Sequence, residues 1–290
     1  MEPGQKLRQA IEDGAIQVPG AANALVARLI AQNGFAATYL SGAAFSAGTL
    51  GLPDIGLFTL SELAQHTSYL AKSVDIPLIV DADTGFGDTI NVERTVVELS
   101  AAGAAAIQLE DQQLPKRCGH LSGKSLIDCD AMQRKLRAAV TARGESSLLV
   151  IARTDARDSE GFEAAVDRAQ RYVEAGADWI FPEALLNEDE FAEFARRVEV
   201  PLVANMTEFG KSPLIPFEDL AAMGYAAVLY PVTLMRVAMK AAEAVLQHLL
   251  VDGSQSEVLD LMQTRHELYE LLGYDDFEHR DRSYFGEHPS

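Results

Sequence analysis

Short apolar runs rich in β-branched residues alternate with segments of helical periodicity along most of the chain. A short apolar run indicates a buried strand, and apolar positions three or four residues apart indicate a helix with one buried face. The runs predict eight strands, at residues 16–18, 37–40, 77–80, 106–109, 148–151, 179–181, 201–204 and 227–230. The helical segments between them include residues 23–32, 61–72, 92–102, 162–175 and 188–197.

Eight strand–helix units in a chain of 290 residues predict an α/β fold, a (β/α)₈ TIM-type barrel. The residues at the strand ends support this fold, because many are charged or carry an amide: Asp81, Glu110, Arg153, Glu183 and Asn205. Packing alone does not explain so many polar strand ends, whereas barrel enzymes carry their chemistry there. A doubly wound open sheet is the alternative, but it does not usually need eight such endings.

The last part of the chain extends beyond the eighth strand. Residues 234–250 have the pattern of a last barrel helix, and the helical stretch 256–272 has no strand after it. We therefore expect one barrel domain over residues 1–290, with a helical extension from about residue 251 to residue 290. Such an extension packs either on a neighbouring subunit or against its own barrel.

The charge balance of the chain disfavours some classes of binding partner. Asp+Glu number 43 against Lys+Arg 24, for a formal net charge of -19. This excess disfavours nucleic acid or an anionic membrane surface as a partner. No apolar run approaches the roughly 20 residues that span a bilayer. The two cysteines cannot form a disulfide framework, and residues 1–5 lack the features of a signal peptide, so we expect a cytoplasmic protein.

Asp81 and Asp83 are the strongest acidic feature of the chain. Residues two apart in an extended chain share a face, so both carboxylates can project from one strand end. With Glu110 one strand away, they form an oxygen-rich site of the kind that suits Mg²⁺. The competing interpretation is an Asp-rich turn that caps the next helix.

Cys118 lies within the segment Lys116-Arg117-Cys118-Gly119-His120. Nearby positive charge stabilises a thiolate, so this thiol could exchange a proton near neutral pH. A lone cysteine that only packs in the core is the competing interpretation. Zinc binding is disfavoured, because Cys118 and Cys129 lack a second Cys/His pair at ligand spacing, and Cys129 is expected to be structural.

Three arginines are candidate clamps for a carboxylate, since a guanidinium matches a carboxylate bidentately. Arg153 is the best placed of them, because it ends a strand. For Arg236 and Arg265, on predicted helices, a solvated helix face is the simpler interpretation. Asn205-Met206-Thr207 ends the seventh strand and could donate hydrogen bonds to an anionic ligand.

Ten segments of the chain, in order and at matching spacing, resemble the isocitrate lyase/phosphoenolpyruvate mutase superfamily over nearly the whole length. They are YLSG (39–42), GLPD (51–54), DADTGFG (81–87), EDQ (110–112), KRCGH (116–120), ARTDA (152–156), FPEA (181–184), NMTEFG (205–210), YP (230–231) and MQTR (262–265). Within the superfamily the chain is most similar to the branch that cleaves 2-methylisocitrate. The cysteine in KRCGH separates it from the mutase branch.

The resemblance implies a role for each matching residue. Asp81 and Asp83, with Asp54 and Glu110 in support, would hold Mg²⁺, for which Mn²⁺ is a candidate substitute. The tricarboxylate substrate would contact Ser41, Gly42, Ala43, Cys118, Gly119, Arg153, Glu183, Asn205, Met206, Thr207, Arg236 and Arg265. Cys118, Arg153 and Tyr39 would be catalytic, with Tyr39 taken as the base. The resemblance further implies a homotetramer, a dimer of dimers, whose subunits exchange the C-terminal helix.

The implied reaction is a retro-aldol cleavage of 2-methylisocitrate to pyruvate and succinate, in which Cys118 protonates the succinate carbanion. Phe181, Leu229 and Pro231 would leave room for the substrate's methyl group. One methyl group is worth only about 1–3 kcal/mol of discrimination, so weak isocitrate cleavage is expected as well. A related 2-hydroxy acid lyase, such as a 2,3-dimethylmalate lyase, or an oxaloacetate hydrolase is the alternative. Pro231 argues against the hydrolase, which is expected to carry serine there.

Overall fold

The computed structural model describes residues 1–117, 119–120 and 123–285 and divides into two compact units, residues 1–235 and 236–290. The strands are β1 (Ile16–Pro19), β2 (Thr38–Leu40), β3 (Leu78–Asp81), β4 (Ala106–Glu110), β5 (Leu149–Thr154), β6 (Trp179–Pro182), β7 (Val203–Asn205) and β8 (Ala227–Tyr230). The helices of the first unit are α1 (Pro3–Ala10), α2 (Ala24–Gln32), α3 (Gly42–Leu50), α4 (Leu60–Ser73), α5 (Thr89–Ala101), α6 (Cys129–Arg143), α7 (Ala156–Ser159), α8 (Phe162–Glu174), α9 (Glu188–Arg197) and α10 (Phe217–Met223).

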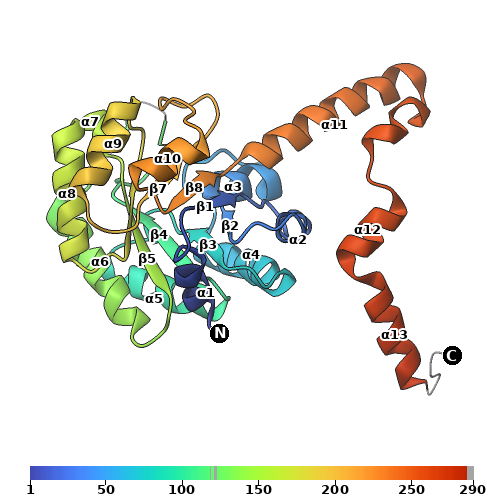
Figure 1. Cartoon of the computed structure of the whole chain (residues 1–290), viewed down its shortest axis with the longest axis horizontal. Helices are drawn as coiled ribbons and strands as arrows, with labels where there is room; N and C mark the ends of the chain where they lie inside the picture. The colour runs from blue at the N-terminus through green and yellow to red at the C-terminus, as the bar shows by residue number, and fades with distance from the viewer. Residues whose placement is uncertain (118, 121–122, 286–290) are drawn as a thin grey trace. The chain divides into compact units, whose positions relative to one another are not determined.

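The strands of the first unit pair in parallel and close into a barrel (Figure 1). One sheet has the order β2-β3-β4-β5-β6 and the other the order β1-β8-β7. Single parallel bridges join them on both sides, from Gly20 to Tyr39 and from Ile180 to Leu202. The predicted (β/α)₈ barrel is therefore confirmed, and each of the eight predicted strands overlaps an observed one.

Side chains alternate between the two faces of each barrel strand. In β5, Leu149 and Ile151 lie in the inner apolar cluster, whereas Val150 and Ala152 pack in the larger cluster that includes the surrounding helices. Because this alternation has a period of two, Arg153 at the end of β5 belongs to the inner set. The same parity places Asp81, Glu110, Glu183 and Asn205 on the inner side of their strand ends. The polar strand ends therefore converge above an apolar interior.

The structure adds helices that the pattern did not predict. The nine residues of α3 are almost all small or apolar, so they carry no amphipathic signal, and the helix begins instead at Ser41, whose side chain accepts a hydrogen bond from Ala44 N. Helix α1 inserts Leu7 into the inner apolar cluster. It is held by Arg8, whose guanidinium donates to Ser147 O at 2.6 Å.

The second unit consists of helical segments: most of α11 (Thr233–Asp252), the 3₁₀ segment η1 (Ser256–Leu261), α12 (Arg265–Leu272) and α13 (Tyr274–Tyr284). Helix α11 corresponds to the helix predicted at residues 234–250, and none of its residues is buried. It carries exposed apolar side chains, including Val237, Met239 and Leu246. Of the helices that the structure describes, none has both the length and the apolar character to cross a membrane.

Candidate active site

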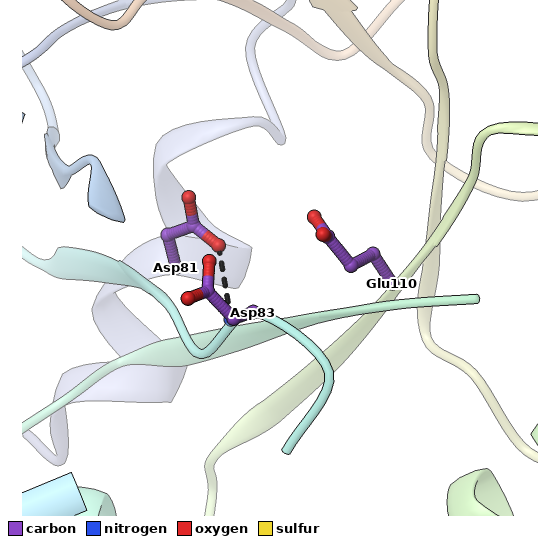
Figure 2. A group of neighbouring side chains, drawn as sticks. All are labelled: Asp81, Asp83 and Glu110. Atoms are coloured by element: carbon purple, nitrogen blue, oxygen red, sulfur yellow. Dashed lines mark hydrogen bonds between the residues drawn. The ribbon is translucent and has the colours of Figure 1, made fainter. Parts of the chain in front are cut away.

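Three carboxylates meet where β3 and β4 end. Asp81, Asp83 and Glu110 each offer an oxygen within 4.8 Å of the others, and all three side chains are buried. Figure 2 shows the three carboxyl groups directed to the same side of the strand ends. Asp81 is fixed by three donors, since its Oδ2 accepts from Gly42 N at 3.1 Å and its Oδ1 from Asp83 N at 3.1 Å and Gln108 Nε2 at 3.2 Å.

The backbone turns sharply at Asp83, which has a φ of 47° although it is not glycine. Such a conformation is uncommon for a residue with a Cβ and often marks a functional site. Burial raises the pKa of Asp83 to about 7, although the Lys116 ammonium, 2.7 Å from Oδ1, acts in the opposite direction. Burial also raises the pKa of Glu110 well above its usual range.

This group fits a divalent cation. Within the described ranges, Glu110 Oε1 is buried and has no hydrogen-bond partner, which is costly unless another group satisfies it. A cation would also relieve the repulsion among three buried carboxylates. Asp54 lies outside this trio and is ion-paired with Lys116 instead. Lys116 thus contacts both Asp54 and Asp83, a role that the sequence did not indicate.

Arg153 lies between Glu110 of the carboxylate trio and two further carboxylates, Asp155 and Glu183. Its Nε and Nη2 donate to the two oxygens of Asp155, each at 3.0 Å, and its Nη1 lies 3.2 Å from Glu183 Oε2. Its Nε also lies 3.6 Å from Glu110 Oε2. The guanidinium covers the ring of Phe181, 5.2 Å from its centre. Arg153 is therefore a rigid, buried cation beside the carboxylate trio.

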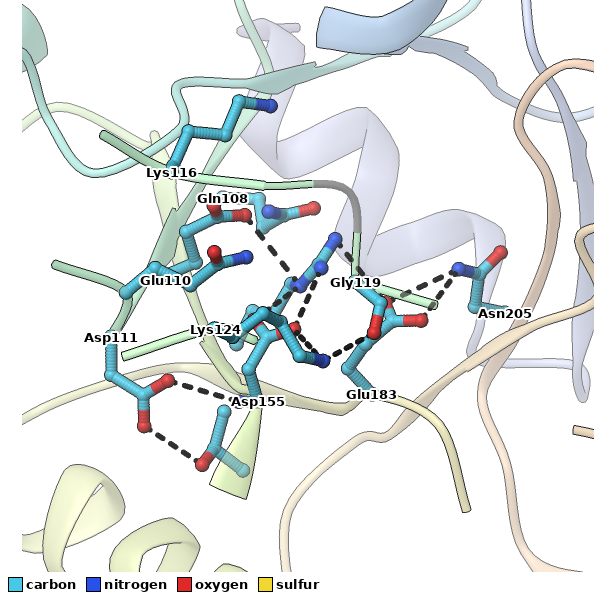
Figure 3. Close-up of polar contacts among 12 residues, drawn as sticks. Gln108, Glu110, Asp111, Lys116, Gly119, Lys124, Asp155, Glu183 and Asn205 are labelled. Carbon is cyan, nitrogen blue, oxygen red and sulfur yellow. Dashed lines mark hydrogen bonds and ion pairs between the residues drawn. The ribbon is translucent and has the colours of Figure 1, made fainter. Parts of the chain in front are cut away.

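Several polar side chains of the site contact Glu183 (Figure 3). Asn205 Nδ2 donates to both of its carboxylate oxygens, at 3.3 and 3.2 Å. His120 Nε2 lies 2.5 Å from Glu183 Oε1, while His120 Nδ1 accepts from Lys211 N at 2.9 Å. Burial acts to raise the pKa of Glu183, but Arg153 and His120 outweigh it and hold this pKa at about 2.

These contacts change the interpretation of the cysteine-bearing loop. Cys118 itself lies outside the described residues. Lys116 is ion-paired with Asp54 and Asp83, and His120 contacts Glu183. Lys116 and His120, two of the three groups that the sequence suggested for tuning the thiol, therefore contact carboxylates instead. The sequence could not indicate this, because the partners come from segments that lie far apart along the chain.

Tyr39 is poorly suited to act as the base. Its hydroxyl donates to Gln108 Oε1 at 2.6 Å, and Gln108 in turn donates to Asp81. Burial and the charge of Asp81 raise the pKa of Tyr39 well above its ordinary value. The phenol is thus protonated at neutral pH, and the contacts indicate that it orients Asp81 through Gln108.

The other predicted residues fall into three groups. Ser41 and Gly42 are buried at the start of α3, beside the acidic group, and Ala43 follows them half-buried. Met206 is buried with opposite parity to Asn205, and its sulfur accepts from Ile215 N, so its side chain points away from the barrel interior. The remaining positions are Thr207 (half-buried), Phe181, Leu229 and Pro231 (buried in the barrel unit), and Arg236 and Arg265 (in the second unit, where their role stays a prediction).

Comparison with known proteins finds relatives that match nearly the whole chain. The chain is 58% identical over 280 residues to the 2-methylisocitrate lyase of Aeropyrum pernix, covering 96% of this chain and 90% of that protein. It is 50% identical over 268 residues to the 2-methylisocitrate lyase of Bacillus subtilis, covering 92% and 88%.

Solved structures give the same result. The crystal structure of a 2,3-dimethylmalate lyase superimposes with a TM-score of 0.92 at 34% identity, covering 98% of this chain and 96% of that one. A phosphonopyruvate hydrolase in complex with oxalate and Mg²⁺ superimposes with a TM-score of 0.87 at 33% identity, covering 99% and 100%. The family model for phosphoenolpyruvate phosphomutase matches residues 7–250. The barrel, the acidic strand ends and these matches together show that the chain belongs to the phosphoenolpyruvate mutase/isocitrate lyase superfamily.

Proposed function

We propose that this chain is a Mg²⁺-dependent carbon–carbon lyase that cleaves 2-methylisocitrate to pyruvate and succinate. The observation that carries the proposal is the buried trio of Asp81, Asp83 and Glu110 beside the Arg153 guanidinium. Such a site offers a cation for a hydroxy acid and a donor for its carboxylates. The names of the relatives from Aeropyrum pernix and Bacillus subtilis support the same substrate.

Asp81, Asp83 and Glu110 would hold the metal, with Asp54 near Lys116 in support. When bound, Mg²⁺ supplies a Lewis acid that stabilises negative charge on the oxygens of the substrate. Mn²⁺, which also accepts oxygen ligands, is proposed as a substitute. A cation here would compete with the Lys116 ammonium for Asp83, so Lys116 would then rely on Asp54.

Arg153 and Asn205 would bind the carboxylates of the substrate and stabilise the charge that develops on them. Loss of the hydroxyl proton turns the C–O bond into the keto group of pyruvate, and the C–C bond breaks. The electron pair of that bond stays on the succinate fragment. Cys118 is proposed to donate its thiol proton to this carbanion, which leaves a thiolate to be reprotonated.

A substrate panel with and without EDTA tests the function. We expect Mg²⁺-dependent pyruvate release from 2-methylisocitrate, weak activity on isocitrate, and none on 2,3-dimethylmalate or oxaloacetate. Cys118→Ser is expected to lower kcat by about 10³-fold while substrate still binds, since a general acid contributes roughly 10²–10⁴-fold. Turnover of another acid with 2-methylisocitrate untouched would refute the substrate assignment but not the fold.

Metal binding should depend on pH, because the pKa of Asp83 is about 7 in the metal-free protein. Below pH 7 a cation must displace the Asp83 proton, so each unit of falling pH is expected to weaken Mg²⁺ binding about tenfold. Above pH 7 the Asp83 carboxyl group is already ionised and its share of the dependence should level off, while the raised pKa of Glu110 adds a further dependence of its own. Calorimetric titration in two buffers of different ionisation enthalpy measures both the affinity and the protons released. An affinity that stays constant from pH 5.5 to 8 would contradict this assignment.

The methyl group of the substrate is proposed to lie against Phe181 and Leu229, with Pro231 nearby in sequence. These two side chains help line an enclosed apolar cavity of about 10 Å³ inside the barrel, together with Val18, Ile79, Ile151, Val203, Ala227, Tyr39 and Gln108. A cavity of this size holds about one small group. This apolar space supports a substrate that carries one methyl group more than isocitrate.

Enlarging Leu229 to phenylalanine should fill this space. We expect Leu229→Phe to lower kcat/KM for 2-methylisocitrate relative to that for isocitrate by roughly 10- to 200-fold, the value of one methyl group in an apolar pocket. The ratio of the two substrates is measured on one protein sample, so a general loss of stability cancels. An unchanged ratio would place the methyl group elsewhere.

The assembly and location are also proposals. Exposed apolar side chains on α11 and in the second unit, such as Leu250, Leu261 and Phe277, support burial against other subunits. We propose a homotetramer, built as a dimer of dimers that exchange the C-terminal helix, in the cytoplasm. Arg236 and Arg265 of this unit are proposed to bind substrate carboxylates.

A further inference from the structure

The segment between β4 and α6 leaves the barrel and returns through a short antiparallel stem. Gln112 and Leu126 form a β-bridge, and Gln113 N donates to Ser125 O at 2.7 Å. The two ends of the segment 114–124 are therefore held next to each other. Two buried polar side chains at the ends of this segment reach back into it.

Gln112 is the first of these side chains, and it is 1% exposed. Its Nε2 donates to Arg117 O at 2.8 Å, and its Oε1 accepts from Arg117 N at 2.9 Å. One amide group thus satisfies both backbone groups of a single residue five positions along the chain. This pairing fixes the position and the orientation of the Arg117 backbone.

Lys124 is the second, and its side chain is fully buried. Its ammonium donates to Gly119 O and, at 2.9 Å, to Asp155 Oδ1 (Figure 3). Asp155 is the residue that also accepts both hydrogen bonds of the Arg153 guanidinium. Lys124 therefore connects the backbone of Gly119 to the group that orients Arg153.

Gly119 lies directly against the site. A Cβ built on Gly119 would overlap Arg153 Nη2 and the side chain of Glu183, so only glycine allows the backbone to come this close. The Gly119 carbonyl faces the Lys124 ammonium. The backbone on this side of residue 118 is thus held against the arginine–glutamate pair.

We propose that Gln112 and Lys124 are positioning residues that hold the backbone of Arg117 and of Gly119 in place, with Gly119 against the Arg153–Glu183 pair. The proposal rests on the proposed function only for its kinetic consequence. Neither side chain needs to touch substrate. Gln112 fixes the backbone of Arg117, and Lys124 fixes that of Gly119.

Gln112→Met and Lys124→Met test the proposal, because methionine is as long as glutamine and one atom shorter than lysine, and it removes the hydrogen bonds of both. A misplacement of about 1 Å costs roughly 10²-fold in rate, so we expect kcat to fall about 10²-fold in each variant, with the affinity for Mg²⁺ unchanged. Gln133→Met is the matched control, since Gln133 is a part-buried glutamine that bonds Arg171 away from the site.

A second measurement does not need turnover. The rate at which iodoacetamide alkylates Cys118, followed by peptide mass spectrometry on the intact protein, should change at least threefold in both anchor variants and not in Gln133→Met. Cys129, at the start of α6, serves as the internal reference. If the wild type fails to cleave 2-methylisocitrate, the proposed function fails and the alkylation rates still decide this proposal. Unchanged alkylation with kcat reduced only in proportion to the loss of folded protein would overturn it.

Discussion

Asp83→Ala is expected to lower Mg²⁺-dependent release of pyruvate from 2-methylisocitrate by at least about 10⁴-fold, because a metal site contributes several kcal/mol to such a reaction. Asp83 combines a left-handed backbone, burial and a pKa raised to about 7. The variant removes one of the three carboxylates that would hold the cation, so the cation would be bound more weakly and oriented less well.

The stability of this variant should move in the opposite direction to its activity. Burial raises the pKa of Asp83 above its unfolded value, so without metal the wild type loses stability as pH rises from about 4 to 7. Asp83→Ala removes that penalty, and its metal-free melting temperature at pH 8 should equal or exceed that of the wild type. The increase in melting temperature on adding Mg²⁺ should disappear.

Asp88→Ala is the control for this experiment, because Asp88 lies in the same loop but caps α5, where its side chain accepts from Thr89 N. Loss of a helix cap costs roughly 0.5–2 kcal/mol of stability and should leave turnover per folded molecule unchanged. Turnover of Asp83→Ala within tenfold of the wild type would mean that the cation does not bind at this trio.

The barrel was predictable because each strand is a local signal. The eight apolar runs are short and are separated by helical segments, and the strand order of a barrel follows from the chain order. The limits of this approach are seen at α3, whose small apolar residues carry no period. They are seen again at β5, which extends to Thr154, three residues beyond the apolar run that predicted it.

The candidate site was predictable to the extent that strand parity decides it. Asp81, Arg153 and Glu183 follow inward-facing apolar positions and Glu110 follows the inward-facing Gln108, so the alternation places them together without any knowledge of the loops. Met206 follows the same alternation, with the opposite outcome. It follows Asn205 directly, and the step of one residue turns its side chain outward.

The pairings of the long cationic side chains could not be predicted. Lys116, Lys124 and His120 lie within nine positions of the chain, yet their carboxylate partners come from the ends of three different strands. Which carboxylate each one meets depends on how the loop between β4 and α6 folds back. In the sequence alone they are a local cluster of positive charge, whereas in the structure they are distributed among Asp83, Asp155 and Glu183.

Arg153→Met is expected to remove activity and to weaken the barrel at the same time. The guanidinium supplies several donors to the site, and the loss of one such donor typically costs 10²–10³-fold, so we expect kcat/KM to fall by about 10⁴-fold. The variant also leaves Asp155, Glu183 and Glu110 without their shared cation. Removal of one partner from a buried ion pair costs roughly 3–5 kcal/mol.

The pH dependence of unfolding separates these effects from a general loss of packing. In the wild type the pKa of Glu183 is about 2, below its unfolded value, so its contribution to stability is present above about pH 4.5 and is lost as pH falls toward 2. In Arg153→Met the effect of burial on Glu183 is opposed less, so the pKa of Glu183 rises. The stability that the protein loses as pH falls from about 4.5 toward 2 should therefore be smaller. Arg157→Met, which breaks a bidentate pair with Glu190 outside the site, should keep its activity, and its acid profile should change only by the part that comes from Glu190, whose pKa Arg157 lowers. An Arg153→Met protein with the wild-type acid profile would show that Arg153 does not control Glu183.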